Sequence, residues 1–240
     1  LVLINKHHSI PDDYTFPLGT IKGNMQCDER IIPELLEMLQ AAKEDGVSLI
    51  ICSPYRDINR QQVLFERKIK AYMKKGYSYL EAYQISAQTV TVPGASEHQI
   101  GLAIDFLCRG YSSLNEGFAD TEGGKWLAEH SYEYGFILRY PQDKVSLTEI
   151  GHETWHYRYV GTPHASYIMQ NNLCLEEYIA LVNSHTQDNP LYVTDLSLTN
   201  WMIYYVPSNA GSHTDVTVPI ENDYQICGNN SDGFIVAVKL

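Results

Sequence analysis

The chain has 240 residues, a hydrophobic content of 44%, a charged content of 19% and a formal net charge of −12 at pH 7. This length can bury one sizeable core, or one domain with an extension. An acidic chain without a basic face is not expected to bind nucleic acid or an anionic membrane surface, and the lack of a run of about 18 apolar residues predicts no membrane span.

The first half of the chain is predicted to mix short strands with longer helices. Hydrophobic periodicity predicts strands at 1–5, 47–53 and 101–108 and helices at 28–45, 57–74 and 78–90. Asp57 is the predicted N-cap of its helix, and Ser78 with Glu81 forms a predicted capping box. The second and third of these helices therefore carry their own start signals.

The second half begins in the same way and then changes character after Pro190. Helices are expected at 123–135, 166–172 and 175–183, and strands at 136–140, 155–161, 201–206, 215–220 and 233–240. We predict a catalytic domain over 1–190 and a β-rich extension over 191–240. Strands and helices without regular βαβ alternation predict an α+β fold.

The cysteines do not suggest a disulfide framework. There are five, an odd number, and no Cys-x-x-Cys pair occurs. This usage favours a reducing compartment, and we expect a cytoplasmic protein.

The stretch SEHQIGLAIDF contains two side chains of the kind that bind metals, His98 and Asp105. Successive residues of a strand point to opposite faces, so these two positions cannot face one point from a single strand. We expect His98 on the loop before the strand and Asp105 within it, with Gly101 allowing a close approach of the backbone.

A second cluster, GHETWHYRYV, matches the pattern His-Glu-x-x-His with His152, Glu153 and His156. On a helix this pattern would place two zinc ligands on one face. Its aromatic and β-branched residues favour a strand instead. A helical zinc site with Glu176 or Glu177 as a distant ligand stays open as an alternative.

The other interpretation takes His98, Asp105 and His156 as metal ligands and Glu153 as the catalytic base. Two nitrogens and one carboxylate leave a fourth zinc position for water, as a catalytic site requires. Glu153 and His156 differ in strand parity, so this interpretation needs a bend near 153–155.

Four motifs in order give a resemblance to a known family. SPYRDINRQQ, SEHQIGLAID, GFILRYP and ETWH together resemble the zinc D-Ala-D-Ala metallopeptidases of the VanY group, over roughly residues 28–170. The lack of a predicted anchor resembles the bifunctional VanXY type, which acts in the cytoplasm. This family implies a mixed or antiparallel sheet flanked by helices, from which the 191–240 extension departs.

The resemblance also implies roles for individual residues. The three ligands named above would hold Zn²⁺, and Glu153 would be the catalytic base. Arg56 would bind or polarise the substrate carbonyl, and Gln61 and Ser96 would help to hold the substrate.

The implied function is hydrolysis of the D-Ala-D-Ala dipeptide, of the terminal D-Ala of peptidoglycan precursor pentapeptides, or of both, which removes the vancomycin target. The partner is then a small peptide that ends in D-Ala-D-Ala, and no oligomeric state is predicted. One alternative is a D,D- or L,D-carboxypeptidase that acts only on stem peptides. An alternative of another class is a non-catalytic binding module stabilised by zinc.

Overall fold

A four-stranded antiparallel sheet carries the residues that the sequence singled out. The computed structural model describes residues 1–209, 211 and 213–240. The strand order is β3-β4-β6-β5. The strands are β3 (Leu49–Ser53), β4 (Ala103–Cys108), β5 (Phe136–Leu138) and β6 (His156–Tyr159). All four fall within predicted strands, and the α+β class is confirmed.

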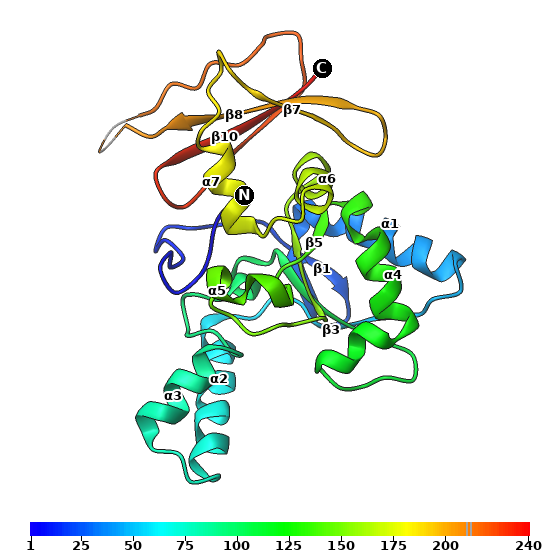
Figure 1. Ribbon diagram of the computed structural model, residues 1–240, viewed down its shortest axis with the longest axis vertical. Helices are drawn as coiled ribbons and strands as arrows, with labels where there is room; N and C mark the ends of the chain where they lie inside the picture. Colours follow the sequence, from blue (N-terminus) through cyan, green and yellow to red (C-terminus); the bar gives the residue numbers. More distant parts are fainter. Residues whose placement is uncertain (210, 212) are drawn as a thin grey trace.

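Two helices cover one face of this sheet (Figure 1). They are α1 (Ile32–Glu44) and α4 (Glu122–His130). Alternate residues of β4 and β6 point into this layer, where Ile104, Phe106 and Tyr157 pack against the two helices. This layer is the main apolar core, and it leaves the other sheet face for polar side chains.

The helices α2 (Ile58–Met73) and α3 (Tyr79–Ala87) form a hairpin that extends away from the sheet (Figure 1). Both predicted starts are confirmed. Asp57 accepts a hydrogen bond from the Arg60 amide, and Ser78 and Glu81 form the full capping box.

The N-terminal segment differs from the prediction. Residues 1–5 do not form a strand, although Leu1, Leu3 and Ile4 are buried. Their backbone makes a hydrogen bond from the Leu3 amide to the Asn229 carbonyl rather than a ladder. The segment is apolar because it packs in a core, and apolar character alone does not distinguish a strand from a buried coil.

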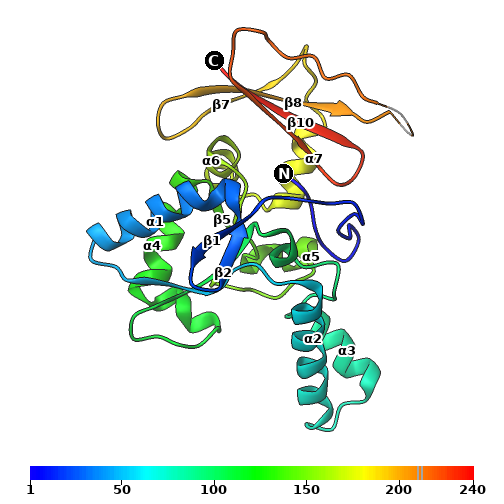
Figure 2. The same ribbon diagram turned by 180° about the vertical axis from the view of Figure 1, so that it is seen from behind.

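A hairpin of β1 (Leu18–Lys22) and β2 (Met25–Asp28) was not predicted (Figure 2). Five short 3-10 helices complete this part of the chain, at Glu29–Ile31, Glu97–Ile100, Glu116–Asp120, Ser131–Tyr134 and Gln142–Lys144. The short helix α5 (Val145–Thr148) follows the last of them.

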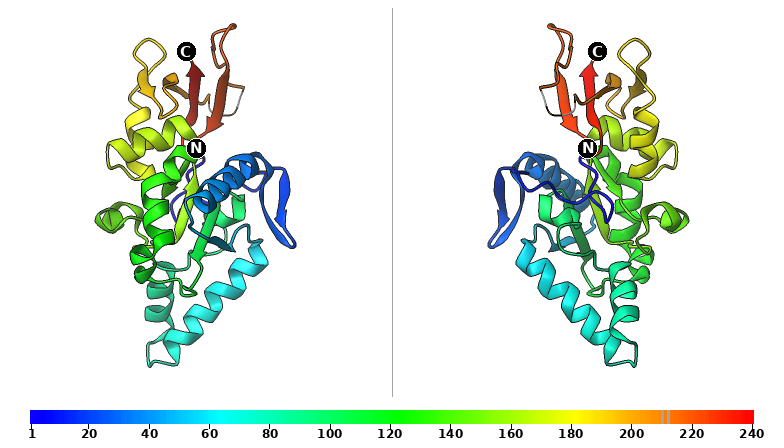
Figure 3. Two further views of the ribbon diagram at one scale, coloured as in Figure 1. Left: turned by 90° about the vertical axis from the view of Figure 1, so that its right-hand side faces the viewer. Right: turned by 90° about the vertical axis from the view of Figure 1, so that its left-hand side faces the viewer.

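A second antiparallel sheet, in the order β7-β8-β10-β9, occupies the C-terminal end of the molecule (Figure 3). Its strands are β7 (Leu191–Thr194), β8 (Asn200–Pro207), β9 (Tyr224–Gly228) and β10 (Gly233–Lys239). The predicted strand at 215–220 is wrong. Val216 and Val218 nevertheless pack on the sheet, so the alternation reflects burial without pairing.

The C-terminal sheet shares a core with the rest of the chain through α6 (Thr162–Gln170) and α7 (Leu175–Val182). Leu3, Ile137 and Ile203 belong to this one cluster although they come from three distant parts of the sequence. A boundary at residue 190 therefore divides the sequence at a point where the packing is continuous.

Among the residues that the structure describes, no helix combines the length and the apolar character that a membrane crossing requires.

All five cysteines are free thiols, and three of them are buried.

The shared core makes a prediction about cooperativity. Ile203 is fully buried between the two parts, so Ile203→Ala should lower the free energy of unfolding by about 2–5 kcal/mol. Ile220→Ala is the matched control, because Ile220 is 100% exposed and the change should stay within about 0.5 kcal/mol. Urea unfolding followed by near-ultraviolet circular dichroism and by tryptophan fluorescence should show one transition. Two separate transitions would mean that the C-terminal sheet unfolds alone.

Candidate metal centre

The register between β4 and β6 brings two of the expected ligands together. Asp105 lies directly opposite His156, and its neighbour Ile104 lies opposite Tyr157. Because side chains alternate along a strand, Ile104 and Tyr157 enter the core while Asp105 and His156 share the opposite face. The sheet thus presents a carboxylate and an imidazole side by side.

The third ligand comes from the turn before β4, as the sequence predicted. His98 lies in the 3-10 helix Glu97–Ile100, which ends at Gly101 in a left-handed conformation, φ 69°. A Cβ atom at position 101 would lie 2.5 Å from the Asp28 amide nitrogen. Only glycine satisfies both constraints, and the turn it permits directs His98 back over the sheet.

His98, Asp105 and His156 are all buried, and one ligand atom of each lies within 4.8 Å of the others. The His98 Nδ1 atom is 2.8 Å from the Pro54 carbonyl oxygen, which can only accept a hydrogen bond. Nδ1 therefore carries the proton, and Nε2 presents a lone pair 3.3 Å from an Asp105 oxygen. Two facing acceptors in a buried site require a cation between them, so these residues fit a metal ion.

The pKa values of this group reflect burial and mutual contact. Burial and the Arg56 charge lower the pKa of His98 to about 4, so its imidazole is neutral at pH 7. Burial opposes protonation of His156 as well, but the neighbouring carboxylates of Asp105 and Glu97 outweigh it and raise the pKa of His156 to about 9. Despite burial, the two histidines hold the pKa of Asp105 well below its usual range.

Glu153 lies beside the three ligands without belonging to the group. The bend expected near 153–155 is present, since a turn at Thr154 and Trp155 precedes β6. One Glu153 oxygen is 3.7 Å from His156 Nδ1. Burial raises the pKa of Glu153 to about 7, and a nearby divalent cation would lower it. A carboxylate that changes its protonation near neutral pH is suited to act as a general base.

Arg56 faces the same site. Its Nη2 atom is 3.9 Å from an Asp105 oxygen, and its side chain is mostly buried. Its backbone amide donates to the His98 carbonyl. Burial lowers the pKa of Arg56 below its usual value, although Asp105 and Glu153 oppose this shift. The site therefore holds a fixed positive charge.

Gln61 and Ser96 line a small cavity of about 30 Å³ next to Arg56, His98 and Glu153. Gln61 is buried, and its Nε2 atom donates to the Thr91 carbonyl at 2.7 Å. Its Oε1 atom is buried and has no partner among the described residues. The side chain is therefore not the solvated helix residue that its position in α2 alone would suggest.

A larger cavity of about 250 Å³ also borders the site. Arg56, Glu153 and His156 line both cavities, and Lys68 and Trp155 line the larger one alone. The reactive groups thus lie between a smaller and a larger cavity. Hollows of more than 600 Å³ occur at the α2–α3 hairpin and near the N-terminus, away from the ligand group.

The helical zinc site considered from the sequence does not form. His156 begins a strand, and the His152 Nδ1 atom contacts the Tyr140 carbonyl oxygen at 3.0 Å. Glu176 binds Arg139, and Glu177 caps α7. Both distant candidates are therefore engaged elsewhere.

Sequence reasoning missed three charged residues behind the site. Glu97, Arg139 and Arg158 are all buried, and Glu97 accepts hydrogen bonds from both arginines at 2.7 Å. Each lies in or beside a motif already singled out. A charged residue within an apolar strand, such as Arg139 in FILRY, is the signal that could have indicated a buried ion pair.

Two histidines, one carboxylate and an adjacent unligated glutamate define a class of protein, the hydrolases with a catalytic metal centre. The sequence profile of the VanY family, described as D-alanyl-D-alanine carboxypeptidase, matches residues 24–162. The chain belongs to this family.

Named relatives agree with this assignment. A D-alanyl-D-alanine carboxypeptidase of Enterococcus faecalis is 42% identical over 180 residues, covering 75% of this chain and 65% of the relative. The bifunctional D-Ala-D-Ala dipeptidase and carboxypeptidase VanXYC of Enterococcus gallinarum is 34% identical over 184 residues, covering 74% of this chain and 92% of the relative. The chain thus spans just under two thirds of the first relative's length.

Solved structures share the fold. The D,D-dipeptidase VanXYg, in complex with a D-Ala-D-Ala phosphinate analogue, matches with a TM-score of 0.86 and 28% identity, over 100% of this chain and 93% of that chain. A VanY D,D-pentapeptidase mutant in complex with Zn(II) matches with a TM-score of 0.69 and 41% identity, over 74% and 97%. The C-terminal extension, which we expected to depart from the family, lies within the match to VanXYg.

The ligand assignment predicts the behaviour of a variant at the neighbouring histidine. His152→Ala should retain one equivalent of zinc, because His152 lies outside the ligand group. His98→Ala is the comparison and should lose tight zinc binding. Metal content after gel filtration, measured by atomic absorption, checks both. Loss of zinc from the His152 variant would favour the helical site.

The raised pKa of His156 predicts that zinc binding releases a proton. At pH 7 a group with a pKa of about 9 is protonated, and its nitrogen must lose the proton to bind metal. Zinc affinity should therefore rise as pH increases towards about 9 and level off above it. Titration calorimetry in buffers of different ionisation enthalpy measures the protons released. A release of none at pH 7 would contradict the assignment.

Proposed function

We propose that this chain is a zinc-dependent D,D-peptidase. It hydrolyses the D-Ala-D-Ala dipeptide, the C-terminal D-Ala of peptidoglycan precursor pentapeptides, or both, and so removes the vancomycin target. The observation that carries the proposal is the group of His98, Asp105 and His156 around one point, with Glu153 beside it and unligated.

The residues have separate tasks in this proposal. His98, Asp105 and His156 hold the metal, and bound zinc lowers the pKa of a coordinated water to about 7 and polarises a carbonyl oxygen. Glu153 takes a proton from the attacking water and later gives it to the leaving amine. Arg56 supplies positive charge where negative charge develops on the carbonyl oxygen.

The two cavities suggest how a short peptide would lie. Their joint border of Arg56, Glu153 and His156 is the place for the scissile bond. The smaller cavity, with Gln61 and Ser96, suits the small C-terminal residue, and the unpartnered Gln61 Oε1 atom is a free acceptor there. The larger cavity suits the residue before it and any longer peptide.

Two alternatives are distinguished by the substrate and by turnover. Carboxypeptidase activity alone, on D,D or L,D ends, would require a long peptide in the larger cavity. A structurally similar protein is the LD-carboxypeptidase LdcB, with a TM-score of 0.62 and 35% identity over 74% of this chain and 84% of that chain. A non-catalytic zinc module would not need a buried glutamate that lies beside the ligands without belonging to them.

We also propose that the protein works in the cytoplasm. The support is chemical, since all five cysteines are free and none needs an oxidising environment.

The proposal predicts that Glu153→Gln keeps zinc and loses turnover by about 10²–10⁴-fold, because the proton acceptor is lost while the ligands remain. D-Ala release from D-Ala-D-Ala, from an L-Lys stem pentapeptide and from its L,D-linked tetrapeptide is measured with the wild type, with the variant and with a chelator. His152→Ala serves as the control that alters the same segment. Full turnover by Glu153→Gln would remove Glu153 from the mechanism, and no release of D-Ala by the wild type would favour the binding module.

A further inference from the structure

We infer that Glu97 is a positioning residue for the metal centre, which sets the tautomer and the orientation of His156. This role rests on the proposed metal site and concerns a residue to which the proposed mechanism gives no task.

The first observation is the pair of atoms that face one another behind the site. A Glu97 carboxylate oxygen, Oε2, lies 3.7 Å from His156 Nε2. Both atoms are buried, and neither has a hydrogen-bond partner within the described part of the chain. The opposite ring nitrogen, Nδ1, points to Asp105 at 3.0 Å. A small rotation of the ring would close the contact with Glu97 into a hydrogen bond.

The second observation is that Glu97 cannot move away from this position. Its other oxygen, Oε1, accepts from Arg139 Nε and from Arg158 Nη1, both at 2.7 Å. Glu97 is 1% exposed, and the two arginines are fully buried. Both guanidinium groups are permanently charged, and their two contacts with Oε1 compensate an ionised carboxylate. The residue is therefore a fixed anion.

A fixed carboxylate at Nε2 determines which nitrogen of His156 carries the proton. A carboxylate accepts and does not donate, so Nε2 must be the protonated nitrogen. Nδ1 then keeps its lone pair for the metal, next to Asp105. A carboxylate that accepts a hydrogen bond from the ring nitrogen opposite the metal sets the tautomer of a metal-binding histidine. It also makes the histidine a stronger ligand.

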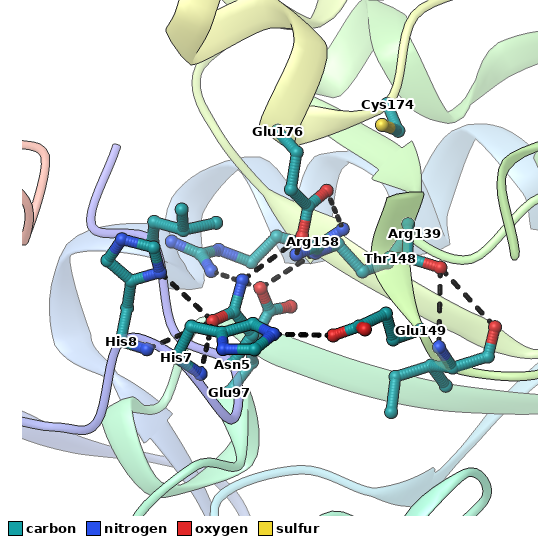
Figure 4. A network of polar contacts seen from close by, with 12 residues as sticks. Asn5, His7, His8, Glu97, Arg139, Thr148, Glu149, Arg158, Cys174 and Glu176 are labelled. Carbon is teal, nitrogen blue, oxygen red and sulfur yellow. Dashed lines mark hydrogen bonds and ion pairs between the residues drawn. The ribbon is translucent and has the colours of Figure 1, made fainter. Parts of the chain in front are cut away.

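The arginines are themselves anchored outside the sheet (Figure 4). Arg139 makes a two-pronged contact with Glu176 at the start of α7, at 2.8 and 2.6 Å. Arg158 donates to the Val2 carbonyl of the N-terminal segment at 2.8 Å. Both anchors lie outside residues 24–162, which the family profile matches. These outer segments therefore brace a metal ligand from behind.

Glu97→Gln separates this role from a purely structural one. If the amide oxygen stays with the arginines, the amide NH₂ group faces Nε2 and favours the tautomer that has its proton on Nδ1. The variant should therefore bind zinc about 10–100-fold more weakly than the wild type. Glu176→Gln is the matched control, because it removes the negative charge opposite Arg139, and Glu176 does not contact a ligand.

The measurements are zinc affinity, by competition with a chromophoric chelator, and urea unfolding of the metal-free proteins. We expect both variants to be less stable and only Glu97→Gln to lose affinity. Equal affinities of Glu97→Gln and wild type, or equal losses in the two variants, would overturn the positioning role. A wild type that binds no zinc would overturn the proposed function as well. A wild type that binds zinc and releases no D-Ala would overturn that function alone.

A measurement on the wild type applies even if Glu97→Gln does not fold. Nitrogen-15 NMR of the histidine rings in the zinc-loaded protein should show His156 bound through Nδ1, with a slowly exchanging proton on Nε2. Metal on Nε2, or an Nε2 proton in fast exchange, would overturn the inference.

Discussion

The pairing of β4 with β6 is the constraint on which the site depends. It places Asp105 opposite His156, and the alternation of the strands sends their neighbours into the apolar core. A shift of one residue in this register would exchange the two faces and bury the carboxylate among aromatic rings. Folding of the core and assembly of the metal centre therefore rest on one set of backbone hydrogen bonds.

Burial of this much charge is costly, and the structure offsets the cost by arranging the charges in layers. Arg56 faces Asp105 at the front, and Glu97 faces His156 at the back. Behind Glu97, the two arginines lie between Glu97 and the outer segments of the chain. An isolated buried ion pair gives little net stability, but removing one partner costs several kcal/mol. The arrangement therefore restricts the site to a single geometry and adds little to the free energy of unfolding.

No residue of the C-terminal sheet lines either cavity of the candidate site, yet the sheet is not separate from the part of the chain that carries the site. Its strands complete the core that holds α6, α7 and the first residues of the chain. The first residues and α7 in turn hold Arg158 and Arg139. A role in bracing the site from a distance agrees with the match of VanXYg along this entire chain.

The sequence alone determined the capped helices, the strands of the central sheet and the candidate ligands, because these follow from local periodicity and from motifs whose residue types define their chemistry. It did not determine the N-terminal coil, the β1–β2 hairpin or the unpaired segment at 215–220, since burial without pairing leaves the same pattern as a strand. Only the tertiary structure decided that Glu97, Arg139 and Arg158 meet behind His156. The reason is physical: a buried charge is tolerated only where a partner from a distant segment reaches it, and that distance is a property of the packed chain.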